Sequence, residues 1–153
     1  MKPVEKNIGI VNVSFGEYVH IVQPVNLYGC TIGNNCFIGP FTEIQSDVFI
    51  GENCRIQSHS FICTGVQIGE NCFIAHGVMF VNDDFKSGGP AGDASAWRKT
   101  KIGNWVSIGS NATIMPVSIC DQVVIGAGAV VVKDINEPGI YAGNPAVFIR
   151  KLV

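Results

Sequence analysis

Charged residues are scarce in this chain of 153 residues. Only 14% of the positions are Asp, Glu, Lys or Arg, against about 25% in an ordinary globular protein. The formal net charge of -2 provides no basic surface, so a nucleic-acid partner is not expected. With 47% hydrophobic residues the chain is too apolar to be disordered. The length predicts a single folded domain, which we place at residues 1–153.

Long apolar runs are also missing. The longest one, Val123 to Val132, is about half of the ~20 residues that a membrane-spanning helix needs. The opening MKPVEKNIGIVNVS has no apolar stretch before a small-residue cleavage site. We therefore expect no membrane span and no secretion, and we predict a cytoplasmic location.

Sequence patterns that bind metal ions are also scarce. The chain has three histidines, and its six cysteines form no CxxC pair, so the spacing of a zinc ribbon is absent. A cytoplasmic setting also disfavours disulfide bonds. We expect no metal, and we expect the cysteines to be structural.

What the chain does have is a repeat of six residues. Isoleucine or an equivalent recurs at that interval at positions 32, 38, 44, 50, 56, 62, 68, 74 and 80, and the frame resumes at Ile102. A period of six fits neither an amphipathic helix nor a simple alternating strand. It is typical of an all-β parallel β-helix, in which each hexapeptide is a short strand plus a corner and three hexapeptides form one triangular coil. We predict five to six coils, each stabilised by stacking on its neighbours.

Within each hexapeptide, the first residue should point inward and the fifth should be small. Cys36, Cys54 and Cys72 all occupy the fifth position and are eighteen residues apart, which is one coil. They should therefore stack as a ladder of small, soft side chains in the narrow interior.

The frame is interrupted in three places. Residues 86–101 form a loop rich in Gly, Ala and Ser, and a loop of this length in a compact domain is usually functional. The interval from Ile114 to Ile119 is five residues and should tighten one corner. After Val131 the frame ends, so residues 134–153 should form an irregular or short helical cap, with residues 1–20 as the opposite cap.

The hexapeptide run, the loop and the closing IGAGAVVVKDI…AGNPAVFIRK resemble the left-handed β-helix acyltransferases over nearly the whole chain. Four segments look more narrowly like the nucleotide-linked 3-amino-sugar N-acetyltransferases of surface-polysaccharide pathways: SHSFIC (58–63), HGVMFVND (76–83), WRKT (97–100) and VSIGSNATIMP (106–116). The resemblance implies left-handed winding, acetyl-CoA as the acyl donor, and a homotrimer with active sites between adjacent prisms. Two features depart from related patterns: a residue is missing after Pro116, and no appended domain of the kind found in serine acetyltransferases is seen.

Five polar residues are candidates for the acceptor side of the site. His59 and His76 fall at the same corner of successive coils. We predict that His76 is a general base or orients an amine, although a corner imidazole can also simply bond to a neighbouring coil. Asn82 lies where the loop departs, and the resemblance implies contact with the amino sugar. Asp83 and Asp84 are candidates for binding sugar hydroxyls, but Asn-Asp-Asp is also an ordinary loop opening.

For the cofactor, small residues should leave a groove for an extended pantetheine arm, and a backbone N–H near Gly109 is a candidate oxyanion donor. These residues are Gly109, Ser110, Ala127 and Gly128. The resemblance implies that Lys133 and Arg150 meet the CoA phosphates and that Pro145 packs on adenine. The alternative for both cations is plain solvent exposure near a terminus.

The leading hypothesis is acetyl-CoA-dependent N-acetylation of the amino sugar of a dTDP- or UDP-3-amino sugar. One alternative in the same fold is O-acetylation of a sugar or small alcohol. A γ-carbonic-anhydrase-like metalloenzyme is less favoured because it needs three zinc-binding histidines including a close pair, and the pair is absent. A non-catalytic β-helix module is the remaining alternative, and it predicts no binding of acetyl-CoA.

Overall fold

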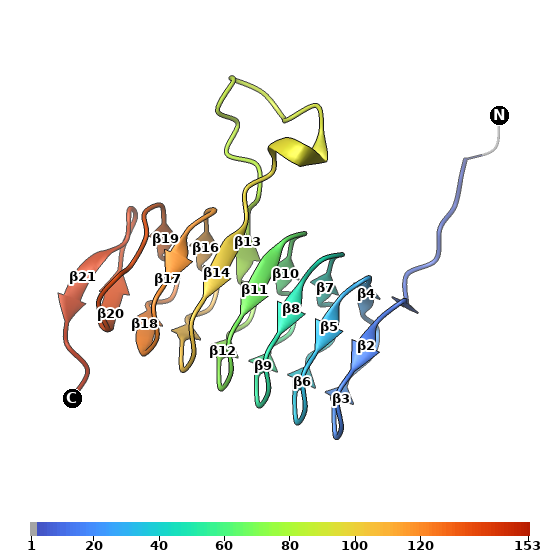
Figure 1. The fold of residues 1–153 in the computed structure, drawn as a ribbon, viewed down its shortest axis with the longest axis horizontal. Coiled ribbons are helices and arrows are strands. Elements are labelled where there is room, and N and C mark those ends of the chain that lie inside the picture. Colours follow the sequence, from blue (N-terminus) through green and yellow to red (C-terminus); the bar gives the residue numbers. More distant parts are fainter. Residues whose placement is uncertain (1–2) are drawn as a thin grey trace.

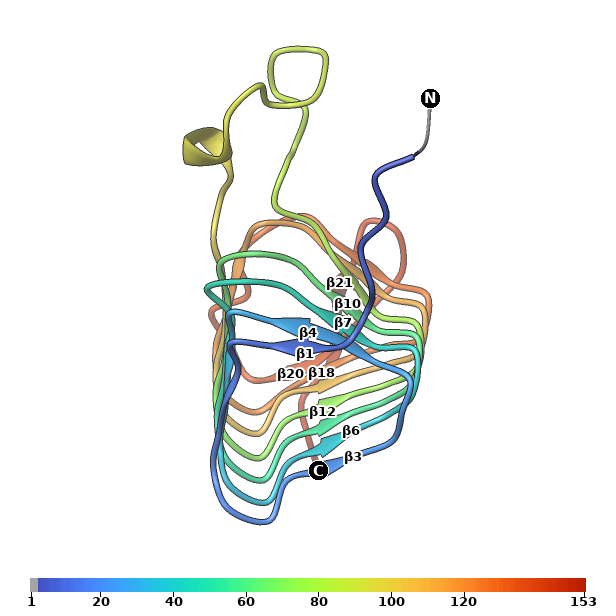
Figure 2. The same cartoon turned by 90° about the vertical axis from the view of Figure 1, so that its right-hand side faces the viewer.

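The chain folds into a parallel β-solenoid of about seven turns, described here by a computed structural model for residues 3–153 (Figure 1). Its short strands form three sheets, which we call A, B and C in the order in which the chain visits them. Seen from the N-terminal end, the chain winds anticlockwise as it recedes, so the coil is left-handed (Figure 2). The predicted left-handed β-helix is confirmed.

Sheet A has seven strands: β1 (Ile10–Val11), β4 (Asn26–Tyr28), β7 (Glu43–Ile44), β10 (Phe61–Ile62), β13 (Met79–Phe80), β16 (Thr113–Ile114) and β19 (Val130–Val131). Sheet B has six: β2 (Ser14–Phe15), β5 (Thr31–Ile32), β8 (Phe49–Ile50), β11 (Val66–Ile68), β14 (Thr100–Ile102) and β17 (Ser118–Ile119). Sheet C has eight: β3 (His20–Ile21), β6 (Phe37–Ile38), β9 (Arg55–Ile56), β12 (Phe73–Ile74), β15 (Ser107–Ile108), β18 (Val123–Ile125), β20 (Gly139–Ala142) and β21 (Val147–Arg150).

The hexapeptide explains the packing. The frame isoleucines from Ile32 to Ile74 are almost completely buried and stack in register, for example Ile50 on Ile32 and Ile68. Each such side chain contributes about 1.5–3 kcal/mol by leaving water. The small fifth residues are buried beside them. Where these are hydroxyl-bearing they bond to backbone carbonyls, as Ser60 does to Ala75 at 3.0 Å. The interior is therefore apolar, and every described buried side-chain N or O atom has a hydrogen-bond partner.

The predicted cysteine ladder is present. The three thiols donate to glycine carbonyls of the next coil, each at 3.1 Å: Cys36 to Gly51, Cys54 to Gly69 and Cys72 to Gly103. Hydrogen bonding with Cys36 and Cys72, together with burial, raises the pKa of the Cys54 thiol well above its ordinary range. All six cysteines are free. The ladder therefore fills space and satisfies backbone oxygens.

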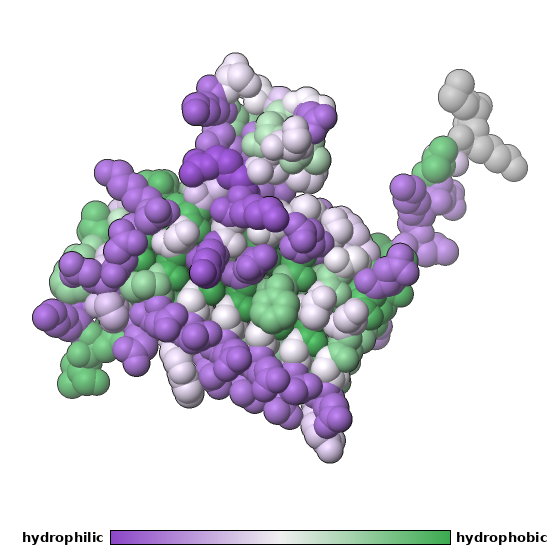
Figure 3. Space-filling model, in the orientation of Figure 1, coloured by the Kyte–Doolittle hydropathy of each residue, from purple (hydrophilic) through white to green (hydrophobic). Residues whose placement is uncertain are grey.

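The corners carry the turn chemistry. The fourth residue of a hexapeptide repeatedly has positive φ, as at Asn35, Asn53 and Asn71 on successive coils, and asparagine is one of the few residues that adopt this conformation readily. At this corner, between sheets B and C, polar side chains also bond between coils, as Asn34 does to Glu52 at 2.8 Å. A hydrophilic band crosses the lower part of the face in Figure 3, where these corners lie.

Three boundaries differ from the sequence prediction. The solenoid has about seven turns rather than five to six, because β1, β2 and β3 form a coil within residues 10–21 that shows no clear hexapeptide frame. The expected irregular or helical cap at 134–153 contains instead a hairpin, in which β20 and β21 pair antiparallel. The loop predicted at 86–101 occupies 81–99, since Thr100 and Lys101 belong to β14 and pair with β11.

Residues 81–99, which we call the arm, project from the corner between sheets A and B (Figure 1). The arm contains one short 3-10 helix, η1 (Ala94–Ala96), capped by the Asp93 side chain. A 2.9 Å hydrogen bond from the Arg98 N–H to the Asn82 carbonyl closes the base of the arm. An exposed ion pair of Lys99 with Asp47 at 3.3 Å joins that base to the prism. Within residues 3–153, the structure contains no helix long and apolar enough to cross a membrane.

Candidate active site

His76 lies at the corner between sheets C and A, which we call the C-to-A corner; on successive coils it comprises residues 57–60, 75–78, 109–112 and 126–129. The His76 carbonyl accepts a hydrogen bond from the N–H of Asn111 at 2.9 Å, and the Gly77 N–H donates to the carbonyl of Ser58 at 3.0 Å. The corner is thus bonded to the coils on both sides. The His76 side chain is exposed, and its Nδ1 lies 2.9 Å from the hydroxyl of Ser58.

His59 occupies the same corner one coil earlier, as the sequence predicts. It has a φ of 63° and its side chain is exposed. The imidazole stacks on Phe41 of the preceding coil, with ring centroids 4.9 Å apart and a tilt of 31°. The two histidines share the corner but differ in contacts: His59 packs on an aromatic ring, whereas His76 is held by a hydroxyl.

Asn82 lies at a different corner from His76. It follows β13 on the side facing sheet B, at the root of the arm, while His76 precedes β13. Its Nδ2 donates to the carbonyl of Thr64 at 3.4 Å. Within one prism, therefore, the fold does not bring His76 and Asn82 to the same corner.

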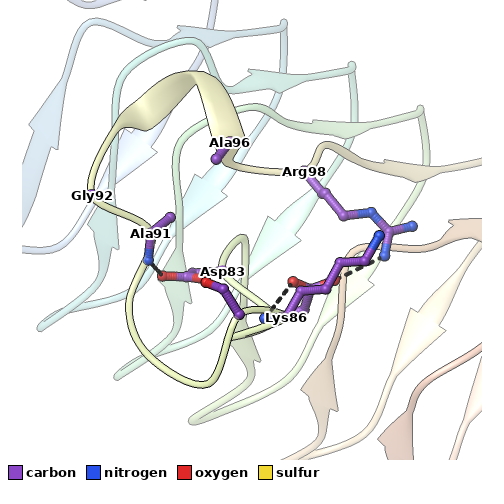
Figure 4. Close-up of a pocket in the computed structure, with 8 residues that line it drawn as sticks. Asp83, Lys86, Ala91, Gly92, Ala96 and Arg98 are labelled. Atoms are coloured by element: carbon purple, nitrogen blue, oxygen red, sulfur yellow. Dashed lines mark hydrogen bonds and ion pairs between the residues drawn. The ribbon is translucent and has the colours of Figure 1, made fainter.

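Asp83 and Asp84 organise the arm. The Asp83 carboxylate faces the arm's own backbone at Ala91, as Figure 4 shows. Asp83 accepts from the N–H groups of Phe85 at 3.0 Å and Ala91 at 2.7 Å, and Asp84 pairs with Arg98 at 3.2 Å. They line a cavity of about 600 Å³ together with Lys86, Ser87, Ala91, Gly92, Ala96 and Arg98. Both residues therefore help to shape the loop. This role corresponds to the ordinary loop opening that the sequence analysis gave as the alternative to binding sugar hydroxyls.

The four small residues predicted for the cofactor groove lie at the C-to-A corner on the two coils that follow His76. Two of their four backbone N–H groups donate to carbonyls of neighbouring coils: those of Gly109 and Gly128, both at 2.8 Å. Within the described chain, the N–H groups of Ser110 and Ala127 have no such partner. Lys133, Pro145 and Arg150 are all exposed, on the last coil and on the β20–β21 hairpin.

A polar network that the sequence analysis did not single out runs along sheet A to the arm. Glu43 accepts from Asn26 at 3.1 Å and from Gln45 at 3.0 Å, and Gln45 in turn accepts from the Thr64 N–H at 3.2 Å. Thr64 is the residue whose carbonyl accepts from Asn82. The available signal was positional, because Ser46, Thr64 and Asn82 are eighteen residues apart and so share one corner. The same signal locates Ser58 beside His76.

Among residues 3–153, no group of three or more His, Cys, Asp or Glu side chains is arranged to hold a metal ion.

Two family models match the repeat region. The model of the bacterial transferase hexapeptide (six repeats) matches residues 29–64 and 47–82, and that of the hexapeptide repeat of succinyl-transferase matches residues 99–133. Together they cover more than half of the chain.

Curated relatives match in part. A probable macrolide acetyltransferase of Lysinibacillus sphaericus is 53% identical over 53 residues, which are 34% of this chain and 29% of that protein. A chloramphenicol acetyltransferase of Agrobacterium fabrum is 51% identical over 63 residues, or 40% of this chain and 27% of that protein. The matched region thus spans less than a third of each relative's length.

Solved structures match over most of the chain. AntD, an N-acyltransferase from Bacillus cereus solved as a point variant with dTDP and coenzyme A, is 24% identical and has a TM-score of 0.79, covering 90% of this chain and 83% of that chain. A maltose O-acetyltransferase from Clostridium difficile is 26% identical with a TM-score of 0.58, covering 94% and 71%. The repeat models, the coil geometry and these likenesses agree, and the chain belongs to the hexapeptide-repeat β-helix acyltransferases.

Proposed function

We propose that this protein transfers an acetyl group from acetyl-CoA to the amine of an amino sugar carried on a nucleoside diphosphate, with dTDP- and UDP-3-amino sugars as the candidate acceptors. The observation that carries the proposal is His76, an exposed imidazole fixed through one ring nitrogen at a corner of the prism. The fold supports it as well, since AntD has a similar fold and was solved with dTDP and coenzyme A.

The reaction requires few groups. The neutral amine attacks the thioester carbonyl, a C–N bond forms, the C–S bond breaks, and the amine proton passes through His76 to the CoA sulfur. The tetrahedral oxyanion needs a donor aimed at it. We assign this role to the N–H of Ser110, which stacks one coil after His76 and is free of the inter-coil bonds that occupy Gly109.

The active form in this proposal is a homotrimer. His76 and Asn82 are at different corners of one prism, so a site that uses both needs a second prism to bring its arm corner against the C-to-A corner of the first. Asn82 would then contact the sugar. Asp83 and Asp84 would act by holding the shape of the arm, with His59 beside the acceptor.

The cofactor would lie along the C-to-A corner beyond His76. Gly109, Ser110, Ala127 and Gly128 leave the space that a pantetheine chain needs, and Lys133 and Arg150 are exposed cations toward the C-terminal end of the prism, where the CoA phosphates would be. Pro145 would pack on the adenine. No metal enters the proposed chemistry.

A second candidate is O-acetylation of a sugar or small alcohol, which the similarity to a maltose O-acetyltransferase favours. The two reactions make different demands on His76. An alcohol must lose its proton as it attacks, whereas a neutral amine is already nucleophilic, so replacing His76 should be more damaging to O-acetylation.

The test is a transfer assay with acetyl-CoA and a panel of acceptors: dTDP- and UDP-3-amino sugars beside maltose and galactosides. Mass spectrometry of the products before and after mild alkali separates a stable amide from a labile ester. His76→Ala should lower turnover at least tenfold, while His20→Ala, an exposed histidine on β3, serves as the matched control. A stable product from an amino sugar supports the proposal. An ester formed only on alcohols, or wild-type turnover in His76→Ala, refutes it.

A further inference from the structure

A single hydroxyl holds the side chain of His76. The Oγ of Ser58 lies 2.9 Å from His76 Nδ1, within the range of a good hydrogen bond. We infer that Ser58 is a positioning residue, which fixes His76 so that Nε2 is the nitrogen that meets the acceptor. The inference rests on the acyl transfer proposed above and names a residue and an atom within that site.

The fold determines this contact closely. Ser58 and His76 are eighteen residues apart and occupy the same position of stacked coils, which lie about 4.8 Å apart. The Gly77 N–H bonds to the Ser58 carbonyl at 3.0 Å, and the Ala75 N–H bonds to Ile108 at 2.9 Å. Both flanks of His76 are therefore fixed to neighbouring coils. The remaining freedom is the rotation of the imidazole, and that is what the hydroxyl restrains.

Gly77 suits this turn. Its φ is +67°, a region that glycine adopts without penalty. A Cβ at this position would also lie too close to the side-chain oxygen of Asn111 on the next coil. The turn that carries His76 can therefore lie close to the Asn111 side chain of the next coil.

A hydroxyl suits the proton transfer that the proposed reaction requires. The Ser58 hydroxyl can accept from Nδ1–H or donate to a bare Nδ1. We assign the first arrangement to neutral His76, because only that one leaves on Nε2 the lone pair that can accept the amine proton. When His76 is protonated, both nitrogens donate, and the Ser58 oxygen still accepts. Among the described residues, no carboxylate is hydrogen-bonded to either nitrogen of His76, and Nε2 has no partner at all. Nε2 is therefore free to take the proton from the amine and pass it to the thiolate of CoA.

The neighbouring histidine supports the assignment by contrast. His59 is also exposed at this corner, but its ring stacks on Phe41, and no described residue forms a hydrogen bond with its nitrogens. Its tautomer is therefore not fixed by the fold. Of the two histidines, only His76 has one nitrogen assigned to the protein and the other left for a ligand.

The first test reads the tautomer without requiring activity. In the full-length chain with 15N-labelled histidine, His76 should appear as the form protonated on Nδ1 at pH 8. Ser58→Ala should shift it toward a mixture of the two tautomers, whereas Ser58→Thr, which keeps a hydroxyl, should not. Ser46→Ala is the matched control, because Ser46 occupies the same hexapeptide position but bonds to Thr64 at 3.4 Å. An unchanged tautomer in Ser58→Ala would overturn the inference.

The second test is kinetic. With acetyl-CoA and an amino-sugar acceptor, Ser58→Ala should lower kcat about tenfold, corresponding to about 1.4 kcal/mol, with little change in the KM of either substrate. Ser58→Thr should restore most of the rate. A purely structural role predicts a lower melting temperature and equal damage in Asn34→Ala, which removes an inter-coil side-chain bond from the corner between sheets B and C. That result counts against positioning. If the wild type transfers acetyl to no acceptor, the proposed function fails, while the tautomer measurement still decides the role of Ser58.

Discussion

The contact between coils at Gly51 offers the sharpest test of the fold. Gly51 begins a corner between sheets B and C and lies directly under the next coil. An alanine Cβ at this position would be 2.7 Å from both the carbonyl carbon and the oxygen of Gly69, and 2.9 Å from the nitrogen of Glu70. Ordinary contacts start at 3.4 Å, so the shortfall is roughly 0.7 Å against backbone atoms that cannot rotate away.

Gly51→Ala must therefore push two coils apart or distort the corner. Overpacking of a close-packed interior typically costs 1–3 kcal/mol, and rigid backbone on the opposite side places this case at about 3 kcal/mol. For a chain of this size each kcal/mol lowers the melting temperature by about 2–4 °C. We expect a decrease of about 6–12 °C, measured by circular dichroism at a fixed protein concentration, because the proposed trimer would make the melting temperature depend on concentration.

The matched control is Gly92→Ala in the arm, where an added Cβ meets nothing within 4 Å. Its melting temperature should equal that of the wild type. If Gly51→Ala also melted within about 2 °C of the wild type, close contact between coils would not be what requires glycine at this position, and the steric reasoning would be wrong.

Three further predictions concern the core, the arm and the thiols. Ile62→Ala removes a fully buried side chain and should cost about 2–5 kcal/mol in urea unfolding; a cost below 1 kcal/mol would contradict tight packing. Asp83→Ala leaves two N–H groups of the arm without an acceptor, so limited proteolysis should cut the arm faster while the melting temperature stays unchanged. Burial raises the pKa of Cys30 and Cys63 from 9.0 to about 11; between these values the unfolded chain loses thiol protons that the folded chain retains, so stability should fall from pH 9 to pH 11. The urea midpoint should therefore fall less between pH 9 and pH 11 in Cys63→Ala than in the wild type. An equal fall in both would show that the Cys63 thiol does not cause the loss of stability.

The fold was largely predictable because its repeat leaves a direct trace in the sequence. Isoleucine at every sixth position identifies the inward residues, and the eighteen-residue interval between Cys36, Cys54 and Cys72 identifies the coil. The first coil was missed because Ile10 and Phe15 are exposed there, so no buried residues impose a pattern. The hairpin after Val131 was missed for a related reason, since the residues of β21 are all exposed.

The site was predictable only as far as the repeat extends. Because His59 and His76 lie in frame, their shared corner followed from counting. The arm has no sequence repeat, so the course of its backbone cannot be inferred by counting residues. The hydrogen bond from the Ala91 N–H to the Asp83 carboxylate was therefore not predicted. The hexapeptide frame places His76 and Asn82 at separate corners of one prism. It does not show how two prisms would pack to bring these residues together.

The arm leaves and re-enters the solenoid without shifting its register. Strand β14 continues the stack on β11, and β16 continues the stack on β13, as though an ordinary corner joined β13 to β14. The loop at such a corner can be replaced by loops of other lengths, because doubling the length of a loop costs only about 0.6 kcal/mol in closure entropy. Residues 81–99 can therefore be treated as a replaceable segment. Arms of other lengths and compositions could be grafted between Phe80 and Thr100 to test whether the arm selects the acceptor, while the prism and its C-to-A corner stay as they are.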